Sequence, residues 1–156
     1  MSRMNRVFGF IYRQLIETPA RGKTYEILHD RLELNGQVLA SRLSGKSDTA
    51  ANRAVVAHII GIERWGQRRL QILLGEPVVQ DEYDSYRPDE TCPLSILLDI
   101  FLRTRGESVR IAALLQQAGI PVSGRAPHND AGSLSVAGWL TYFIQHAEIV
   151  SRAIKK

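Results

Sequence analysis

Hydrophobic residues recur at helical spacing in four long segments of this chain, and no other feature restricts the fold as much. The segments span about 24–43, 50–75, 93–118 and 133–155. Their apolar residues stand three or four apart, as on one face of an α-helix, and none shows the sustained alternation of a half-buried strand. Amphipathic helices bury such faces by packing against one another. The sequence therefore predicts an all-α fold, a four-helix bundle.

Residues that favour helix ends stand at the borders of these segments. Thr24 suits the N-cap of the first helix, and Gly75 suits the end of the second. Pro93 fits the first turn of the third helix. The fourth helix begins at Ser133 or Ser135, both of which are good N-cap residues.

Two longer connections, 76–91 and 119–132, join the second, third and fourth segments. Both are rich in Pro, Gly, Asp and Ser, which favour loops. Connections of this length allow a crossover in the bundle. Residues 4–18 predict a short additional helix. We therefore divide the chain into a basic N-terminal arm or short helix, 1–23, and the bundle, 24–156.

The formal net charge of +4 comes entirely from the N-terminal arm, which holds five basic side chains and one acidic side chain. A nucleic-acid-binding domain usually carries a basic stripe across its folded body. The location of the charge therefore argues against nucleic-acid binding. A basic arm also suits docking on an acidic partner or a second subunit.

The composition, 44% hydrophobic and 23% charged residues, is ordinary for a globular protein. No apolar run approaches the roughly 18 to 20 residues of a membrane helix. Arg13, Gln14 and Glu17 interrupt the apolar N-terminal stretch, unlike the centre of a signal peptide. A single cysteine, Cys92, excludes an intramolecular disulfide framework. We expect a cytoplasmic protein with no membrane partner.

The common enzymatic motifs are missing from the sequence. It has no P-loop, no dinucleotide-binding glycine fingerprint, no Cys-x-x-Cys and no His-Glu-x-x-His, so we expect no organic cofactor. Among the histidines, His29 lies among charged neighbours and favours a solvated or half-buried structural position. His128 lies in a loop and suits a surface position or the mouth of a site.

His58 and His146 each lie on the apolar stripe of a different helix, so both side chains should point into the bundle. A single inward histidine is usually a satisfied core residue. Two of them on separate helices also form a candidate metal site, because metal sites in bundles use inward-facing side chains of facing helices. Neutral imidazole binds zinc, nickel and iron. Both interpretations stay open at this point.

The stretches VVAHIIGIERWGQRRL, 55–70, and SLSVAGWLTYFIQHAEIVSRAI, 133–154, resemble the DinB-like family of bacterial four-helix bundles, which includes YfiT-like proteins. The resemblance covers about 24–156. It implies a divalent metal held by one histidine of the second helix and a His-x-x-x-His pair of the last. His58 and His146 match the first two ligands. The third position is Val150, which cannot coordinate a metal, so the triad is incomplete.

The resemblance implies a metal-dependent enzyme, such as a thiol-dependent transferase, an isomerase or a hydrolase. The metal, zinc, nickel or iron, would act as a Lewis acid. Glu63 and Tyr142 are candidates for a general base or an orienting group. The catalytic residues and the substrate stay undetermined.

The alternative is a non-catalytic, metal-free bundle that binds a small ligand or a protein partner. Aromatic side chains of the second and fourth helices would line its pocket: Trp65, Trp139, Tyr142 and Phe143. The resemblance also implies a homodimer. Leu140, Ile144 and Ile149, beside the main stripe of the fourth helix, offer a surface for the second copy.

Overall fold

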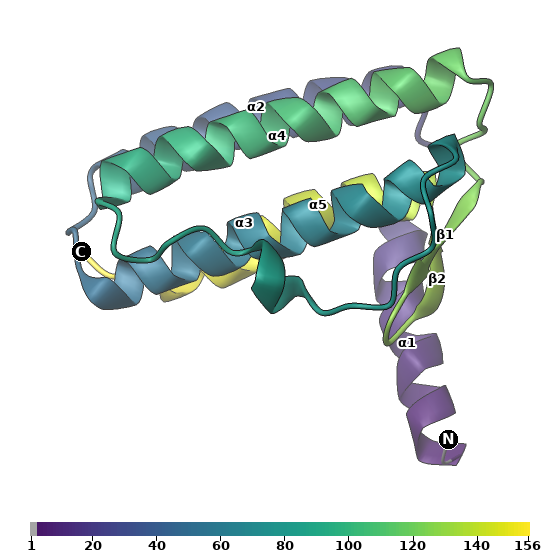
Figure 1. Cartoon of the computed structure of the whole chain (residues 1–156), viewed down its shortest axis with the longest axis horizontal. Helices are drawn as coiled ribbons and strands as arrows, with labels where there is room; N and C mark the ends of the chain where they lie inside the picture. The colour runs from purple at the N-terminus through teal and green to yellow at the C-terminus, as the bar shows by residue number, and fades with distance from the viewer. Residues whose placement is uncertain (1–2) are drawn as a thin grey trace.

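The computed structural model describes residues 3–156, with side chains from residue 8 onward, and over this range it is mostly helical. The all-α bundle is confirmed at this level. The described residues form five α-helices and not four, because the N-terminal segment is a full helix, and they also form a two-stranded sheet (Figure 1). In chain order the elements are α1 (Arg3–Ala20), α2 (Tyr25–Ser44), α3 (Ala50–Gln71), η1 (Ile72–Leu74), η2 (Tyr83–Tyr86), α4 (Leu94–Gln117), β1 (Arg125–His128), β2 (Gly132–Ser135), α5 (Val136–Val150) and η3 (Ser151–Ala153).

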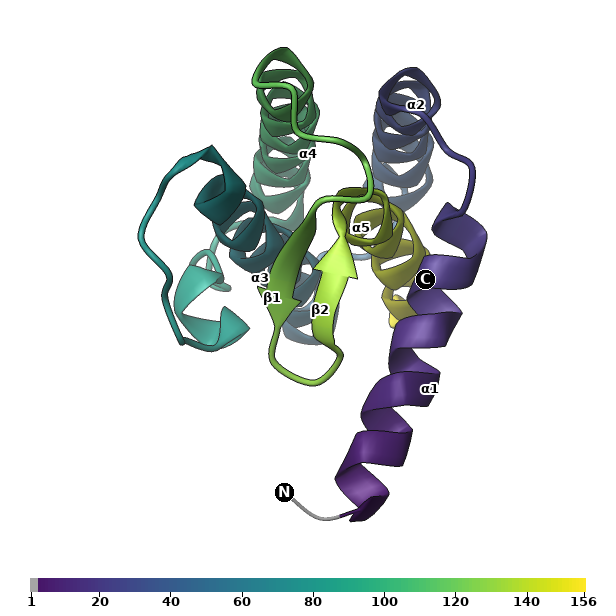
Figure 2. The ribbon, with the colours of Figure 1, turned by 90° about the vertical axis from the view of Figure 1, so that its right-hand side faces the viewer.

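Helices α2, α3, α4 and α5 lie side by side. Both α2 and α3 pack against α4 and α5. The view along the bundle places α2 and α3 at opposite corners (Figure 2). The connection 75–93 runs back along the bundle from the end of α3 to the start of α4, so these two helices point the same way (Figure 1). The crossover connection is therefore present.

Helix α1 lies across one end of the bundle and extends beyond it (Figures 1 and 2). It packs against α5 and β2. Its inner face includes Ile16 and Ala20, which are buried, and a Cβ at Gly9 would lie 2.7 Å from the Asp130 carbonyl oxygen. This close approach explains a glycine in the middle of the helix. Within the described residues, no helix has the length and apolar character needed to cross a membrane.

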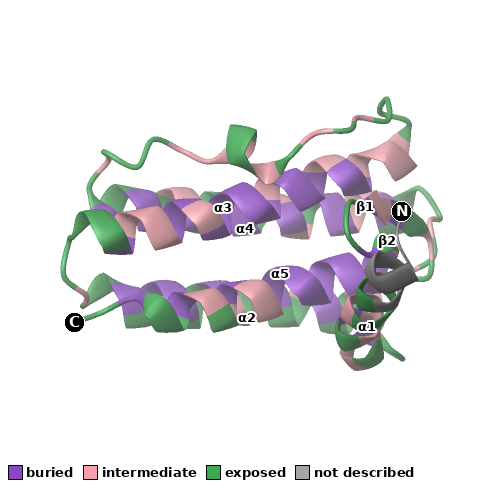
Figure 3. Ribbon diagram, turned by 90° about the horizontal axis from the view of Figure 1, so that it is seen from below, coloured by how far each residue is buried: buried purple, intermediate pink, exposed green. Residues whose placement is uncertain are grey.

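Helix α5 is buried on most of its sides, because α1, α2 and α3 all pack against it (Figure 3). This burial changes the interpretation of its second apolar face. Leu140 and Ile144 are buried within the single chain, and Ile149 is exposed. Two of the three residues that offered a dimer surface are therefore used in the fold, and the homodimer stays a prediction.

Close packing between α3 and α5 depends on Gly66. A Cβ at this position would collide with the ring of Phe143 and would lie 2.9 Å from a ring carbon of Trp139. Trp139 and Phe143 are almost completely buried. Large aromatic side chains on α5 can lie against α3 only where α3 has no side chain. Gly66 thus brings the two histidine-bearing helices close together.

A buried ion pair crosses the bundle between α3 and α4. Arg105 donates to both carboxylate oxygens of Glu63, over 2.8 and 3.1 Å. Ser108 Oγ donates to the same carboxylate over 2.7 Å. Glu63 and Arg105 are 1% and 2% exposed. The Glu63 carboxylate is therefore engaged in the core, and this position does not suit the general base for which the sequence made it a candidate.

The segment expected to be a plain loop, 119–132, contains strand β1 and leads into β2, which corrects the expectation of helices alone. The strands are antiparallel, with Arg125 opposite Ser135 and His128 opposite Gly132. Each strand has four residues, too few to show an alternating pattern in the sequence. Of the two serines proposed to begin the fourth helix, Ser135 is the N-cap, and its side chain accepts from the Gly138 backbone N–H.

Candidate functional site

His58 on α3 and His146 on α5 lie next to each other. Their ring centroids are 5.1 Å apart and the ring planes are inclined by 53°. Both side chains are half-buried, so both still reach solvent. The direct packing of α3 on α5 brings them together. The structure thus places side by side the two histidines that were candidates for a shared site.

Both imidazoles are neutral at pH 7. Burial, with an added contribution from neighbouring His58, lowers the pKa of His146 to about 4. Burial also lowers the pKa of His58, with an added contribution from the Arg87 guanidinium, while Asp84 opposes this change. A neutral imidazole keeps one nitrogen lone pair free. The pair is therefore in the protonation state that metal binding or hydrogen bonding to a ligand requires.

The crossover connection covers the outer side of the pair. The Tyr83 ring of η2 lies edge-on against His58, with centroids 5.2 Å apart. Gly61 on α3 permits this arrangement, because a Cβ there would lie 2.6 Å from Arg87 Cγ and 3.2 Å from the Tyr83 carbonyl oxygen. A larger residue at this position would push the connection off α3 and away from the histidine pair.

The third ligand position of the resembled family carries no donor. Val150 lies one turn after His146 and packs against an apolar cluster at this end of the bundle. Throughout residues 3–156, no group of three His, Cys, Asp or Glu side chains is placed to hold a metal ion. The described residues therefore offer two imidazoles and no third protein ligand of these types.

The spacing of the pair fits two ligands of a single ion. Two imidazoles bound to one tetrahedral zinc, with Zn–N bonds of about 2.0–2.1 Å, place their ring centroids roughly 5 Å apart. The observed separation is 5.1 Å. A metal ion could therefore be held by His58 and His146, with water or a small molecule at its remaining positions.

His128 is buried, in contrast to its predicted place at the surface or at the mouth of a site. It is 4% exposed because the β1–β2 hairpin folds its end against the bundle. Four aromatic rings surround it, with centroids 5.1 to 5.7 Å away. The rings belong to Tyr12, Trp65, Trp139 and Tyr142. We call these four residues and His128 the aromatic cluster.

The hydrogen bonds of His128 fix its tautomer. Its Nδ1 accepts from the backbone N–H groups of Asp130 and Ala131, at 3.1 and 3.2 Å. The proton of the neutral ring is therefore on Nε2. Nε2 is buried and has no hydrogen-bond partner in the described part of the chain. Burial lowers the pKa of His128 to about 4, so the ring stays neutral at pH 7.

Tyr142 connects the histidine pair to the aromatic cluster. Its ring lies 5.5 Å from that of His146 and 5.7 Å from that of His128. Its hydroxyl accepts a hydrogen bond from Tyr12, 3.3 Å away. Burial and the neighbouring Tyr12 raise the pKa of Tyr142 far above its usual range. Tyr142 is therefore a neutral phenol, which is unsuited to the role of a general base.

The remaining sequence candidate, His29 on α2, lies at the surface. Its side chain is 42% exposed and lies 3.5 Å from Asp30 and 3.9 Å from Glu33. This agrees with the solvated or half-buried structural position that its charged neighbours predicted. Among the described residues, no ring contact joins His29 to the histidine pair.

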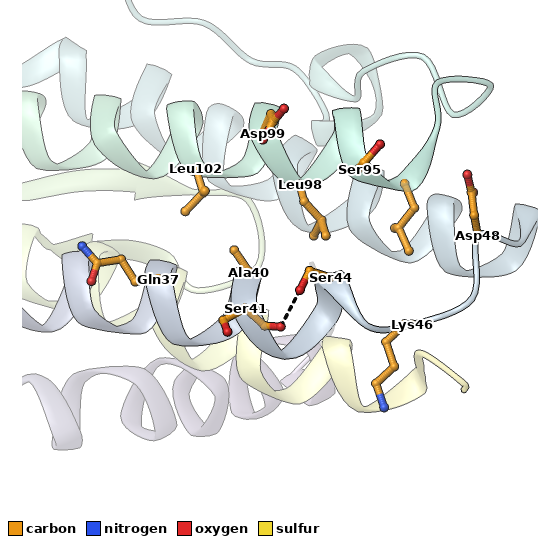
Figure 4. Close-up of a pocket in the computed structure, with 11 residues that line it drawn as sticks. Gln37, Ala40, Ser41, Ser44, Lys46, Asp48, Ser95, Leu98, Asp99 and Leu102 are labelled. Carbon is orange, nitrogen blue, oxygen red and sulfur yellow. Dashed lines mark hydrogen bonds between the residues drawn. The ribbon is translucent and has the colours of Figure 1, made fainter.

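A separate hollow of about 590 Å³ lies between α2 and α4 (Figure 4). Its apolar wall includes Ala40 and Leu98, and its polar side chains include Ser41, Ser44 and Asp99. None of its lining residues belongs to α3 or α5. This hollow is therefore not part of the histidine site.

Comparisons with protein-family models, with curated proteins and with solved structures found no match for this chain. The resemblance to the DinB-like family therefore stays a prediction.

Proposed function

We propose that this protein is a DinB-like bundle that binds one divalent metal ion, zinc, nickel or iron, through His58 and His146. The observation that carries the proposal is the 5.1 Å separation of two imidazoles from adjacent helices. Their low pKa values support it, because both rings are neutral at pH 7 and do not have to lose a proton to bind.

The surrounding residues hold the two rings in place. Tyr83 packs against His58 and Tyr142 packs against His146, so each imidazole has an aromatic neighbour that restricts its rotation. A bound divalent metal would supply Lewis-acid activation of a water or a low-molecular-weight thiol. The reaction class that this chemistry supports is thiol transfer or hydrolysis. The cytoplasmic location and the homodimer belong to the same proposal.

Elemental mass spectrometry on untagged protein, dialysed against zinc or nickel and then against buffer, tests the metal site. We expect close to one metal ion per chain in the wild type and almost none in His58→Ala or His146→Ala. His29→Ala is the matched control, since it removes an exposed histidine of α2, and it should keep the metal. A wild type that takes up no metal would contradict the proposal.

A second candidate function is a metal-free bundle that binds a small ligand or a protein partner. The packing of Val150 into an apolar cluster favours it, because a valine there closes the position of the third ligand. The aromatic cluster also offers an unpartnered N–H at His128 Nε2. Wild-type protein without metal in the experiment above, still folded by circular dichroism, would support this alternative.

A further inference from the structure

A row of charged residues runs along α1 toward the hairpin. Arg13 and Glu17 stand four residues apart on one side of the helix, and Arg21 lies in the turn directly after Ala20, the last residue of α1. Arg125 of β1 reaches the same row, with its guanidinium 3.4 Å from the Glu17 carboxylate. Three cationic side chains and one carboxylate thus line the same hollow.

The Glu17 carboxylate is already used by the fold. It accepts from the backbone N–H of Ser135 and from the Ser135 hydroxyl, both over 2.7 Å. Ser135 is the N-cap of α5, so the carboxylate sits at the helix end that favours negative charge. The charge of Glu17 is therefore shared between α5 and Arg125, and it is not free to neutralise the other two arginines.

Arg13 and Arg21 keep their charge available to a ligand. Within the described residues neither forms an ion pair. The guanidinium carbon of Arg13 lies over the Phe10 ring, 5.5 Å from its centroid. The side chains of the row line a hollow of about 410 Å³ that also includes Gln14 and Arg125. Three guanidinium groups against one engaged carboxylate leave an excess of two positive charges in this hollow.

We propose that this hollow, formed by α1 and the β1–β2 hairpin, binds the phosphate groups of an anionic ligand. Arginine forks donate paired hydrogen bonds to phosphate oxygens. Two available guanidinium groups in one hollow suit a ligand with two linked phosphate groups better than a single phosphate. None of these residues belongs to the histidine pair, and the site is independent of metal binding.

Isothermal titration of the full chain with pyrophosphate in 0.15 M salt tests the proposal. We expect saturable binding of one pyrophosphate per chain, weakened by about tenfold or more in Arg13→Gln/Arg21→Gln through the loss of charged hydrogen bonds. The control variant Arg103→Gln/Arg152→Gln removes the same charge from exposed positions elsewhere and should bind within about twofold of the wild type. Circular dichroism checks that both variants fold.

A vesicle co-sedimentation assay distinguishes a soluble phosphate from a lipid headgroup. Binding of pyrophosphate without sedimentation on phosphatidic acid vesicles assigns a soluble phosphorylated ligand. Sedimentation on phosphatidic acid but not on phosphatidylcholine vesicles, lost in Arg13→Gln/Arg21→Gln only, assigns a headgroup. The proposal is overturned by a wild type that binds neither probe, or by equal losses in the two double variants.

Discussion

His58 with His146 and His128 with its four aromatic rings are two histidine environments within one bundle. The pair is half-buried and its ring centroids are 5.1 Å apart, whereas His128 is 4% exposed and its Nδ1 accepts hydrogen bonds from two backbone N–H groups. Burial lowers the pKa of both His146 and His128 to about 4. A low pKa therefore does not separate a site from a structural residue. Access to solvent and the presence of a second imidazole do.

The largest expected effect is on stability, and it separates the two environments directly. His128→Ala should lower the free energy of unfolding by about 3 kcal/mol, because it leaves a cavity among aromatic rings and two backbone N–H groups without an acceptor. His146→Ala, at a half-buried position, should cost about 1 kcal/mol. Urea unfolding of both variants with EDTA present measures the difference, and equal losses would contradict this assignment of roles.

A third histidine should strengthen metal binding by His58 and His146. Val150→His places an imidazole one turn after His146, where the resembled family has its third ligand. We expect the dissociation constant for zinc to fall by about 100-fold, since structural and catalytic zinc sites use three or four protein ligands. Val109→His, at a half-buried position of α4, is the matched control and should leave the constant unchanged. Competition with a chelating dye measures both.

The smallest effect is the pH dependence that His128 contributes to the stability of the fold. The folded-state pKa of His128 is lowered to about 4, with Asp130 opposing and Arg69 adding to the effect of burial. In the unfolded chain, this imidazole takes up a proton near pH 6.5. The stability that neutral His128 contributes is therefore fully present above that pH and is lost as the pH falls toward 4.

Urea unfolding at pH 7 and pH 5, with EDTA present, measures this loss. Between these two values the wild type should lose about 2 kcal/mol more than His128→Gln, which has no group to titrate at this position. If the two proteins lose the same stability, His128 is not the buried neutral histidine that we describe.

Several local features could be predicted from the sequence. Thr24 and Ser135 cap helices as expected, each accepting from a backbone N–H three residues later. Gly75 has a φ of 99°, a left-handed conformation that favours glycine, and it ends the 3-10 turn after α3. The placement of His58 and His146 on partly buried faces of α3 and α5 follows from the helical repeat. These features depend on residues within one or two turns of each other.

Other features depend on residues far apart in the chain, and here the sequence was insufficient. His128 was expected near the surface because its neighbours Pro127, Asn129 and Asp130 favour a loop. It is buried because Tyr12 of α1 and Trp139 of α5 pack around the hairpin. No periodicity within residues 119–132 contains that information.

By itself, the sequence determined that this chain forms amphipathic helices with a histidine on the apolar stripe of two of them, because helical periodicity is a local property. Only the tertiary structure decided that these histidines lie 5.1 Å apart. It also decided that Arg105 pairs with the Glu63 carboxylate and that Glu17 accepts the backbone N–H of Ser135 at the start of α5. Each of these contacts joins residues more than 40 positions apart, and packing between helices, which no short stretch of sequence encodes, brings them together.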